Sequence, residues 1–305
     1  MPAAAANGRY LGRLVSLSLA MLPPSLGTSI ANVALPSLEI AFGESFAAVQ
    51  WVVLSYLLAV TCLVVGAGRL GDLVGRRPLL LGGIAAFTLA SVAGMLAPNL
   101  GILIAARAVQ GLGAAVMMAL TVASVGDVAP AERAGTAMGL LGTVSAVGTA
   151  LGPSLGGALL SLSGWRAPFA LMAAIGAGAF IASLLALPVA ARTQPKSSLG
   201  FDVPGTLVLA ISLAAYALAA TVGGAAPGVA NAALATLAVV GIAVFFAIER
   251  RAISPLVRLD LLVDGERRGG LLALSVVSTI VMATLVVGPS ISRMPSVSRP
   301  SRSDS

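Results

Sequence analysis

The chain alternates long apolar runs with short polar breaks, and this pattern sets the expected fold. A bilayer core of about 30 Å is crossed by about 20 apolar residues in a helix. The charge-poor runs cover 14–35, 45–68, 78–133, 134–162, 167–189, 203–248 and 269–289. Two runs are long enough for a pair of helices, and each contains a break: Ala97-Pro98-Asn99 in the third, and the Gly/Pro-rich 223–228 in the sixth. The sequence therefore predicts nine membrane-spanning helices.

Basic residues support this count because they gather in alternate breaks. One side carries Arg9, Arg13, Arg69, Arg76, Arg77, Arg133, Arg192, Lys196, Arg250, Arg251, Arg258, Arg267 and Arg268. The other side carries only Arg166 before the tail. Cytoplasmic loops hold an excess of Lys and Arg. We therefore expect a multi-pass protein of the cell membrane with a cytoplasmic N-terminus.

Residues 290–305 depart from the pattern. They are rich in Ser, Pro and Arg, a composition typical of disordered segments. Nine helices would also leave the tail's arginines outside. A displaced reading frame is one explanation.

Composition agrees with the membrane class. The 305 residues are 58% apolar and 10% charged, whereas typical soluble domains are about 45–50% apolar and about 25% charged. Mean hydropathy is +1.02. The net charge of +7 would suggest nucleic acid in a soluble protein, but topology explains these arginines, and no nucleic-acid partner is predicted.

The sequence offers little for cofactor or metal chemistry. It has no histidine, and its one cysteine, Cys62, lies in an apolar run. We therefore expect no metal site, no cofactor and no enzymatic activity. A cleaved signal peptide is the rival interpretation of the start, since Arg9 and Arg13 precede an apolar run, but residues 14–35 are long for one.

Three polar or glycine-rich motifs stand out against this background. The first, a polar stretch expected to be a loop at the water interface, consists of Gly68, Arg69, Gly71, Asp72, Gly75, Arg76 and Arg77. The second contains Arg107, Gln110, Gly111 and Gly113. The third contains Gly148, Gly152, Pro153, Gly156 and Gly157.

Each motif has a physical interpretation. Glycines allow tight turns in the first, and Asp72 can meet a helix end or an arginine. The alternative there is a plain topogenic basic loop. Arg107 is a charge within a predicted helix and needs acceptors or a cavity; snorkelling to the outer interface is its alternative. Gly148, Gly152 and Gly156 lie on one helix face and permit close approach of another helix.

Together these motifs resemble the major facilitator superfamily. The first resembles its loop between helices 2 and 3, the second its helix 4 signature, and the third its helix 5 motif associated with antiporters. The run Asn32-Val33-Ala34-Leu35-Pro36 resembles the end of the helix 1 motif in the fourteen-helix drug:proton antiporter branch. The resemblance covers roughly residues 10–289, and we expect the chain to lack the rest of the second half.

This resemblance implies an all-α polytopic fold with a six-helix N-terminal half of three-plus-three inverted repeats. It implies a latch role for the first motif, a part in proton coupling or substrate binding for Arg107, and antiport for the glycine motif. Gly27 is a departure, since the branch usually places an acid there. No Asp or Glu lies in a predicted helix core, so proton coupling has no obvious carrier.

The expected function is proton-driven efflux of small amphipathic molecules or drugs by alternating access. Asn32, Gln50 and Tyr56, with Arg107 and Gln110, are the candidate cavity residues. The alternative is a truncated orphan half without transport of its own, which could act as a scaffold or assemble with a second subunit that supplies the missing half.

The predicted domain order follows from the breaks. It runs as a cytoplasmic N-terminus (1–13), the six-helix half (14–189), a cytoplasmic linker (190–202), linker helices 7 and 8 (203–249), a cytoplasmic loop (250–268), a ninth helix (269–289) and the tail (290–305).

Overall fold

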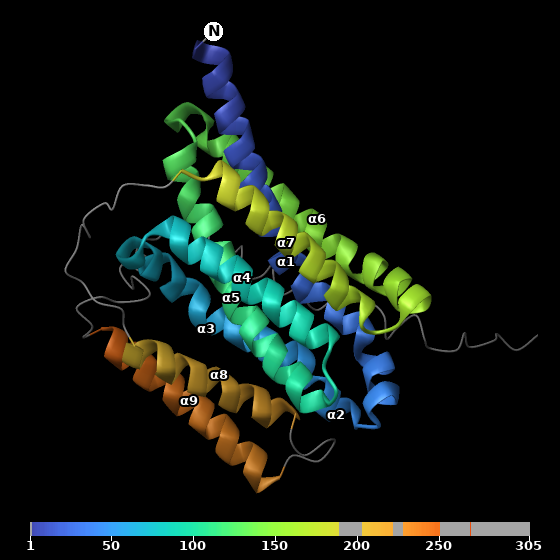
Figure 1. Ribbon diagram of the computed structural model, residues 1–305. Coiled ribbons are helices and arrows are strands. Elements are labelled where there is room, and N and C mark those ends of the chain that lie inside the picture. Colours follow the sequence, from blue (N-terminus) through green and yellow to red (C-terminus); the bar gives the residue numbers. More distant parts are fainter. Residues whose placement is uncertain (1, 189–202, 222–227, 251–268, 270–305) are drawn as a thin grey trace, which may run out of the picture. The chain divides into compact units, whose positions relative to one another are not determined.

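The computed structural model describes residues 2–188, 203–221, 228–250 and 269. The chain divides into two compact units, 1–257 and 258–305. Only the first unit is described in any length. Its described residues form helices joined by short turns, and the all-helical expectation is confirmed (Figure 1).

The helices follow the predicted order. They are α1 (Pro2–Phe42), α2 (Phe46–Val49), α3 (Trp51–Val74), α4 (Arg76–Met95), α5 (Leu100–Val128), α6 (Ala131–Ser163), α7 (Ala167–Ala186), α8 (Val203–Thr221) and α9 (Val229–Glu249). Within the described residues, seven are long and apolar enough to cross a membrane, and α8 is a shorter apolar helix. Apart from residue 269, the predicted ninth helix, 269–289, and the tail lie outside the described residues.

Local sequence signals fix the helix ends. The break at Ala97-Pro98-Asn99 separates α4 from α5, and the Asn99 side chain caps α5 by accepting from the Ile102 N–H at 2.9 Å. Gly75 and Gly164 have φ of 104° and 74° and terminate α3 and α6. Such backbone angles suit glycine, because it has no Cβ.

The expected loop at 68–77 needs correction. The α3 helix continues through Val74 and α4 begins at Arg76, so Gly75 alone separates them. The polar residues are therefore helix ends. Most backbone N–H and C=O groups of these residues form hydrogen bonds within the helices. The polar side chains can reach water from a helix end, so no loop is needed.

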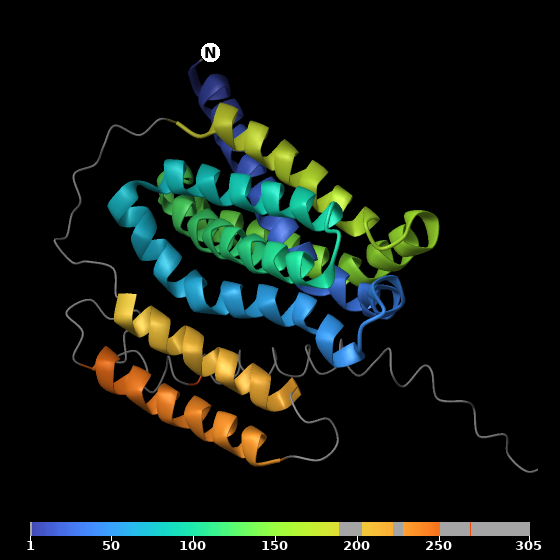
Figure 2. The ribbon, with the colours of Figure 1, turned by 60° about the horizontal axis from the view of Figure 1, so that its bottom comes forward.

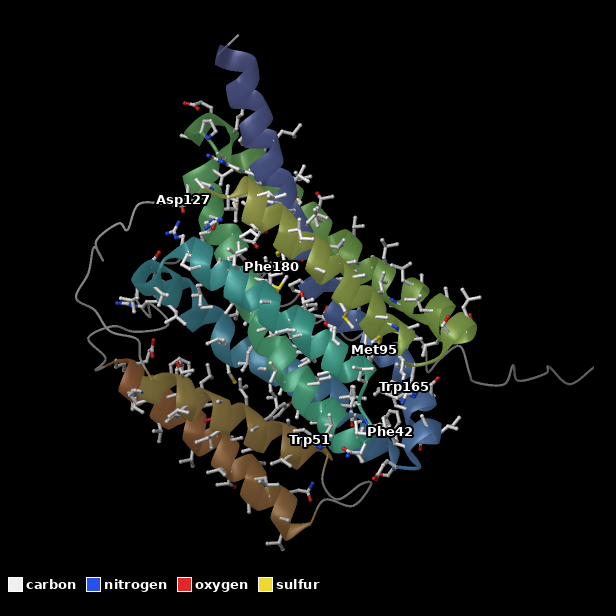
Figure 3. The ribbon with its side chains drawn as sticks, in the orientation of Figure 1. Phe42, Trp51, Met95, Asp127, Trp165 and Phe180 are labelled. Atoms are coloured by element: carbon white, nitrogen blue, oxygen red, sulfur yellow. The ribbon has the colours of Figure 1, made fainter. Side chains whose placement is uncertain are left out.

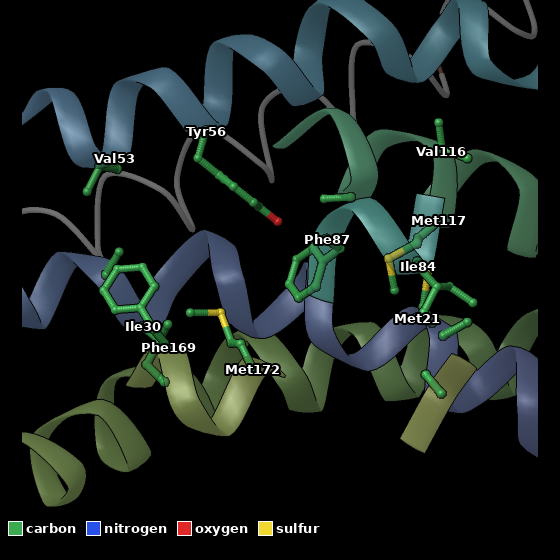
Figure 4. Close-up of a cluster of buried hydrophobic side chains, with 14 of the residues drawn as sticks. Met21, Ile30, Val53, Tyr56, Ile84, Phe87, Val116, Met117, Phe169 and Met172 are labelled. Atoms are coloured by element: carbon green, nitrogen blue, oxygen red, sulfur yellow. The ribbon is translucent and has the colours of Figure 1, made fainter. Parts of the chain in front are cut away.

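The first six spanning helices fall into two groups of three, and most contacts join a helix of one group to a helix of the other. The extensive contacts join α1, α3 and α4 to α5, α6 and α7. The α5 helix lies between α3 and α4, whereas α1 packs against α6 and α7 (Figure 2). The two three-helix segments are thus interleaved, and their contacts form the buried core drawn in Figure 4.

The α8 and α9 helices form a separate antiparallel pair. Gly241 lets them approach closely, because an added Cβ there would overlap Ser212 Oγ. The Asn231 side chain also donates to the Ala219 carbonyl at 2.8 Å. The two helices lie within 203–249, the range predicted for helices 7 and 8, and their role as a linker stays a prediction.

Candidate functional site

A buried arginine joins three helices at the centre of the described fold. The Arg107 side chain on α5 is only 1% exposed. Its Nε donates to the Val52 carbonyl of α3 and its Nη2 to the Gly27 carbonyl of α1, each at 2.9 Å. Charged groups inside a membrane protein require such partners. Arg107 therefore points into the protein, and the snorkelling alternative does not apply.

Gln110 extends this network along α5. It accepts from Arg107 Nη1 at 2.5 Å and donates from Nε2 to Ser91 Oγ of α4 at 2.6 Å. Its Nε2 also lies 3.7 Å from the Met172 sulfur of α7. The Ser91 hydroxyl in turn donates to the Phe87 carbonyl at 2.7 Å. The chain of contacts therefore crosses the bundle from α1 to α7.

The ring of Tyr56 lies against the guanidinium group of Arg107. The Arg107 Cζ lies 4.0 Å from the centroid of the Tyr56 ring, a cation–π distance. The fully buried Tyr56 hydroxyl donates to the Pro24 carbonyl of α1 at 2.8 Å. Figure 4 shows the ring projecting from α3 into the buried cluster. The tyrosine therefore fixes both the cation and the α1–α3 contact.

Gly27 makes room for this arrangement. A Cβ at this position would lie 2.9 Å from Tyr56 Oη. The space beside the position where the family usually carries an acid is thus occupied by the tyrosine. Within the described residues, the hydrogen-bond acceptors of Arg107 are two carbonyls and an amide, all uncharged.

The two glycines of the second motif face different helices, α3 at Gly111 and α4 at Gly113. A Cβ on Gly111 would lie 2.5 Å from the Tyr56 carbonyl oxygen of α3. A Cβ on Gly113 would lie 2.7 Å from both Gly83 O and Phe87 N of α4. These two glycines let α3 and α4 approach α5 closely on its two sides, which brings Tyr56 and Ser91 to the arginine network.

The first motif forms an ionic cluster at one end of α3, α4 and α5. Arg76 contacts Asp72 at 2.9 Å and Asp127 of α5 at 2.9 Å, and it donates to the Ala123 carbonyl at 2.7 Å. Figure 3 places Asp127 at this end of the helices. Arg77 donates to the Leu184 carbonyl near the end of α7 at 3.0 Å, so the motif also reaches the sixth span.

The remaining glycines of this motif differ in their surroundings. A Cβ on Gly71 would overlap the Leu120 side chain of α5, whereas one on Gly68 would meet nothing within 4 Å. Arg69 is partly exposed. Asp127 is the partner that motif spacing alone did not assign, because it lies 51 residues from Arg76. Its place at the end of an apolar run, on the same side as Arg76, was the available signal.

Breaking the ion pair between Arg76 and Asp127 is expected to change stability little. Both side chains are accessible to solvent, at 33% and 60% exposed, and exposed pairs typically contribute about 0.2–1 kcal/mol. Asp127→Asn should lower the free energy of unfolding in detergent by about 0.5 kcal/mol. Glu132→Gln, at the same end of the helices, is the matched control. A loss above about 2 kcal/mol would mean that the pair is part of the folded core.

The third motif brings α6 against α1. A Cβ on Gly152 would overlap Ser29 Oγ, and one on Gly148 would lie 2.9 Å from the Ser25 Cβ. A Cβ on Gly156 would lie 3.0 Å from the Ile30 side chain. These three glycines are buried and share one face, whereas Gly157 would meet nothing within 4 Å. Pro153 lies inside the helix.

Of the candidate cavity residues, Tyr56, Arg107 and Gln110 share the buried network, and Gln50 lines a groove that neither Asn32 nor Tyr56 lines. Tyr56 is enclosed in the core, and Asn32 is partly buried on α1. Gln50 lines a groove of about 220 Å³ with Leu54, Thr61 and Tyr216, between α3 and α8. Their role in substrate binding remains a prediction. Among the described residues, no cluster of His, Cys, Asp and Glu could hold a metal ion.

Apolar helices of spanning length, joined by short turns and linked by a buried cation network, define a polytopic helical membrane protein. Residues 17–299 match the Major Facilitator Superfamily, and the chain belongs to that superfamily. The resemblance stated from the motifs is thereby confirmed.

Curated relatives agree with this assignment. The chain is 32% identical to multidrug resistance protein Stp of Mycobacterium tuberculosis over 91% of this chain and 51% of the relative. It is 34% identical to putative multidrug resistance protein MdtD of Serratia proteamaculans (72% and 45%). It is also 34% identical to riboflavin transporter RibZ of Clostridioides difficile (65% and 43%). The chain thus spans about half the length of these relatives.

Proposed function

We propose that the chain is a transporter that exports small amphipathic molecules by alternating access, with residues 14–189 as its N-terminal half. The buried network of Arg107, Gln110 and Tyr56 carries this proposal, because a charge held inside the membrane by several helices marks a functional site by default. The multidrug resistance names of Stp and MdtD support a drug-like substrate class. The riboflavin transporter among the relatives is compatible with planar amphipathic substrates.

The proposed energy source is the proton gradient across the cell membrane, with the N-terminus in the cytoplasm. In this arrangement, the cluster of Asp72, Arg76 and Asp127 lies on the cytoplasmic face and acts as a conformational latch. Its ionic contacts join α3, α4 and α5 in one state. The close α1–α6 contact at Gly148, Gly152 and Gly156 limits leak in this proposal, because it leaves little space between the two helices.

The test is transport of a fluorescent amphipathic dye into inverted membrane vesicles from cells that express the full chain. An imposed proton gradient should drive dye uptake above that of vesicles without the chain. Asp72→Asn, which removes a latch contact, should reduce the initial rate about tenfold while the amount of folded protein stays unchanged. Glu132→Gln, at the same end of the helices and outside the motif, is the matched control. Dye uptake at the same rate with and without the proton gradient would argue against the mechanism. An initial rate unchanged by Asp72→Asn would do so as well.

A second candidate rests on the length of the chain, which covers about half of its relatives. In this case the chain needs an opposing half, supplied by a second subunit, and has no transport of its own. Purified chain in liposomes distinguishes the two. Dye movement against a proton gradient with no other protein present would eliminate the orphan-half interpretation, whereas activity only in the vesicles would support a partner.

A further inference from the structure

The end of the bundle opposite the ionic cluster carries an open apolar groove. Its volume is about 500 Å³, and its wall includes Met95 of α4, Leu159 of α6, and Ala170 and Leu171 of α7. Its rim is formed by Ser163, the last residue of α6, and Arg166, in the turn before α7. Figure 3 places Met95, Trp165 and Phe42 at this end.

The groove runs from the polar interface into the hydrocarbon. Another lining residue, Ala174, lies about 10 Å along α7 from its first residue, at a rise of about 1.5 Å per residue. Trp165 contacts Phe42 and Phe169, with ring centroids 5.1 and 6.4 Å away. Tryptophan favours the level of lipid headgroups. The rim is therefore at headgroup depth, and the floor is at the depth of the upper acyl chain.

The rim carries an oriented positive charge. The Arg166 Cζ lies 4.2 Å from the Trp165 ring centroid, so the buried tryptophan holds the guanidinium in place beside the groove. Glu39 and Glu44 are at the same end but do not line the groove, and within the described residues Arg166 forms no ion pair. Arginine donors in fork geometry match phosphate oxygens.

From these features we infer that the groove binds an anionic phospholipid, with the phosphate at Arg166 and one acyl chain along α4, α6 and α7. The charge at the rim complements the headgroup, and the apolar wall complements the chain. Because α4 and α7 pack directly against each other here, a bound lipid would seal the shallow space that α6 leaves beside them. This inference does not depend on the proposed transport activity.

The test uses Trp165 as a local reporter, since the chain has two tryptophans and Trp51→Phe removes the other. The full chain is placed in phosphatidylcholine nanodiscs with a small fraction of lipid brominated on its acyl chains. Brominated phosphatidylglycerol should quench Trp165 with about fivefold higher relative affinity than brominated phosphatidylcholine. Concentrated salt should reduce this preference by screening the charge.

Variants separate the charge from the groove. Arg166→Gln should bring the ratio of the two affinities near one, and Arg166→Lys should retain most of the preference. Ala170→Leu, which fills the groove, should reduce quenching by both lipids. Leu162→Ala, an exposed change at the same end that does not line the groove, should leave quenching unchanged. Equal quenching by both lipids in the parent chain, or no effect of Ala170→Leu, would overturn the inference.

A further arm distinguishes a lipid from a small soluble anion. Inorganic phosphate at constant ionic strength should not alter the preference, because it lacks the chain that occupies the groove. If inorganic phosphate abolishes the preference as Arg166→Gln does, the site binds small anions and the lipid assignment fails. Size-exclusion profiles of every variant confirm that quenching is compared between folded proteins.

Discussion

Arg107→Lys is expected to destabilise the protein more than Arg107→Met, although lysine retains the charge. The planar guanidinium reaches the carbonyls of Gly27 and Val52 and the amide of Gln110 at once, and it stacks on Tyr56. An ammonium group cannot reproduce that fork. Lysine therefore leaves a buried charge with fewer partners, whereas methionine removes both the charge and its desolvation cost.

We expect a loss of about 3 kcal/mol in the free energy of unfolding for Arg107→Lys. Arg107→Met should lose about 1–2 kcal/mol, because the Gln110 oxygen loses a donor and the guanidinium contacts disappear. Titration of the purified chain from mild detergent into dodecyl sulfate, followed by tryptophan fluorescence, measures both losses. Arg133→Lys, in the first turn of α6 at the same end as the ionic cluster and away from the Arg107 network, is the control. If Arg107→Lys proved more stable than Arg107→Met, the positive charge, and not the planar geometry of the guanidinium, would hold the helices together.

Gly152→Val is expected to separate α1 from α6. Even the first carbon of a side chain would overlap Ser29 Oγ and lie 3.1 Å from the Ile30 amide nitrogen, so backbone must move. Overpacking of this kind costs about 1–3 kcal/mol, and the backbone contact places this site at the upper end. Gly157 is five residues further along the same helix, and a Cβ added there would meet nothing within 4 Å. Gly157→Val should therefore lower the free energy of unfolding by less than about 1 kcal/mol.

A double-mutant cycle identifies the contact responsible. Ser29→Gly removes the side chain that an alanine at position 152 would strike. Ser29→Gly combined with Gly152→Ala should therefore be more stable than the sum of the two single changes, by about 1 kcal/mol or more. Additive losses in the same detergent titration would place the strain elsewhere. The Ser25–Ser145 hydrogen bond, which links the same two helices at 3.0 Å, remains unchanged throughout.

Much of the fold could be predicted from the apolar runs because spanning length is a strong constraint. The break at Ala97-Pro98-Asn99 and the division of 203–248 both correspond to observed helix ends. The stretch 68–77 was less predictable. Three glycines and a dense set of charges favoured a loop, but only Gly75 leaves helical geometry. A helix end at a water interface tolerates the same polar residues.

The sequence predicted that a buried arginine site exists, but it did not predict which groups the arginine contacts. A charge in an apolar run indicates that Arg107 needs acceptors, but two of the three acceptors are backbone carbonyls on other helices. Backbone atoms carry no sequence signal. The spacing of the third motif predicted a shared face for Gly148, Gly152 and Gly156, and this face packs on α1. The same spacing excludes Gly157 from that face.

The interleaving of the two three-helix segments has a consequence for biogenesis. When α1, α3 and α4 have been synthesised, the helices that they contact most extensively, α5, α6 and α7, do not yet exist. The first three spans are therefore inserted in the bilayer before most of their final helix partners are present. This order agrees with helix insertion that precedes helix association. The later arrival of α5 brings Arg107 to acceptors on α1 and α3 that are already in the membrane. The cost of inserting that charge is then offset during assembly, and the order of synthesis becomes part of how this protein folds.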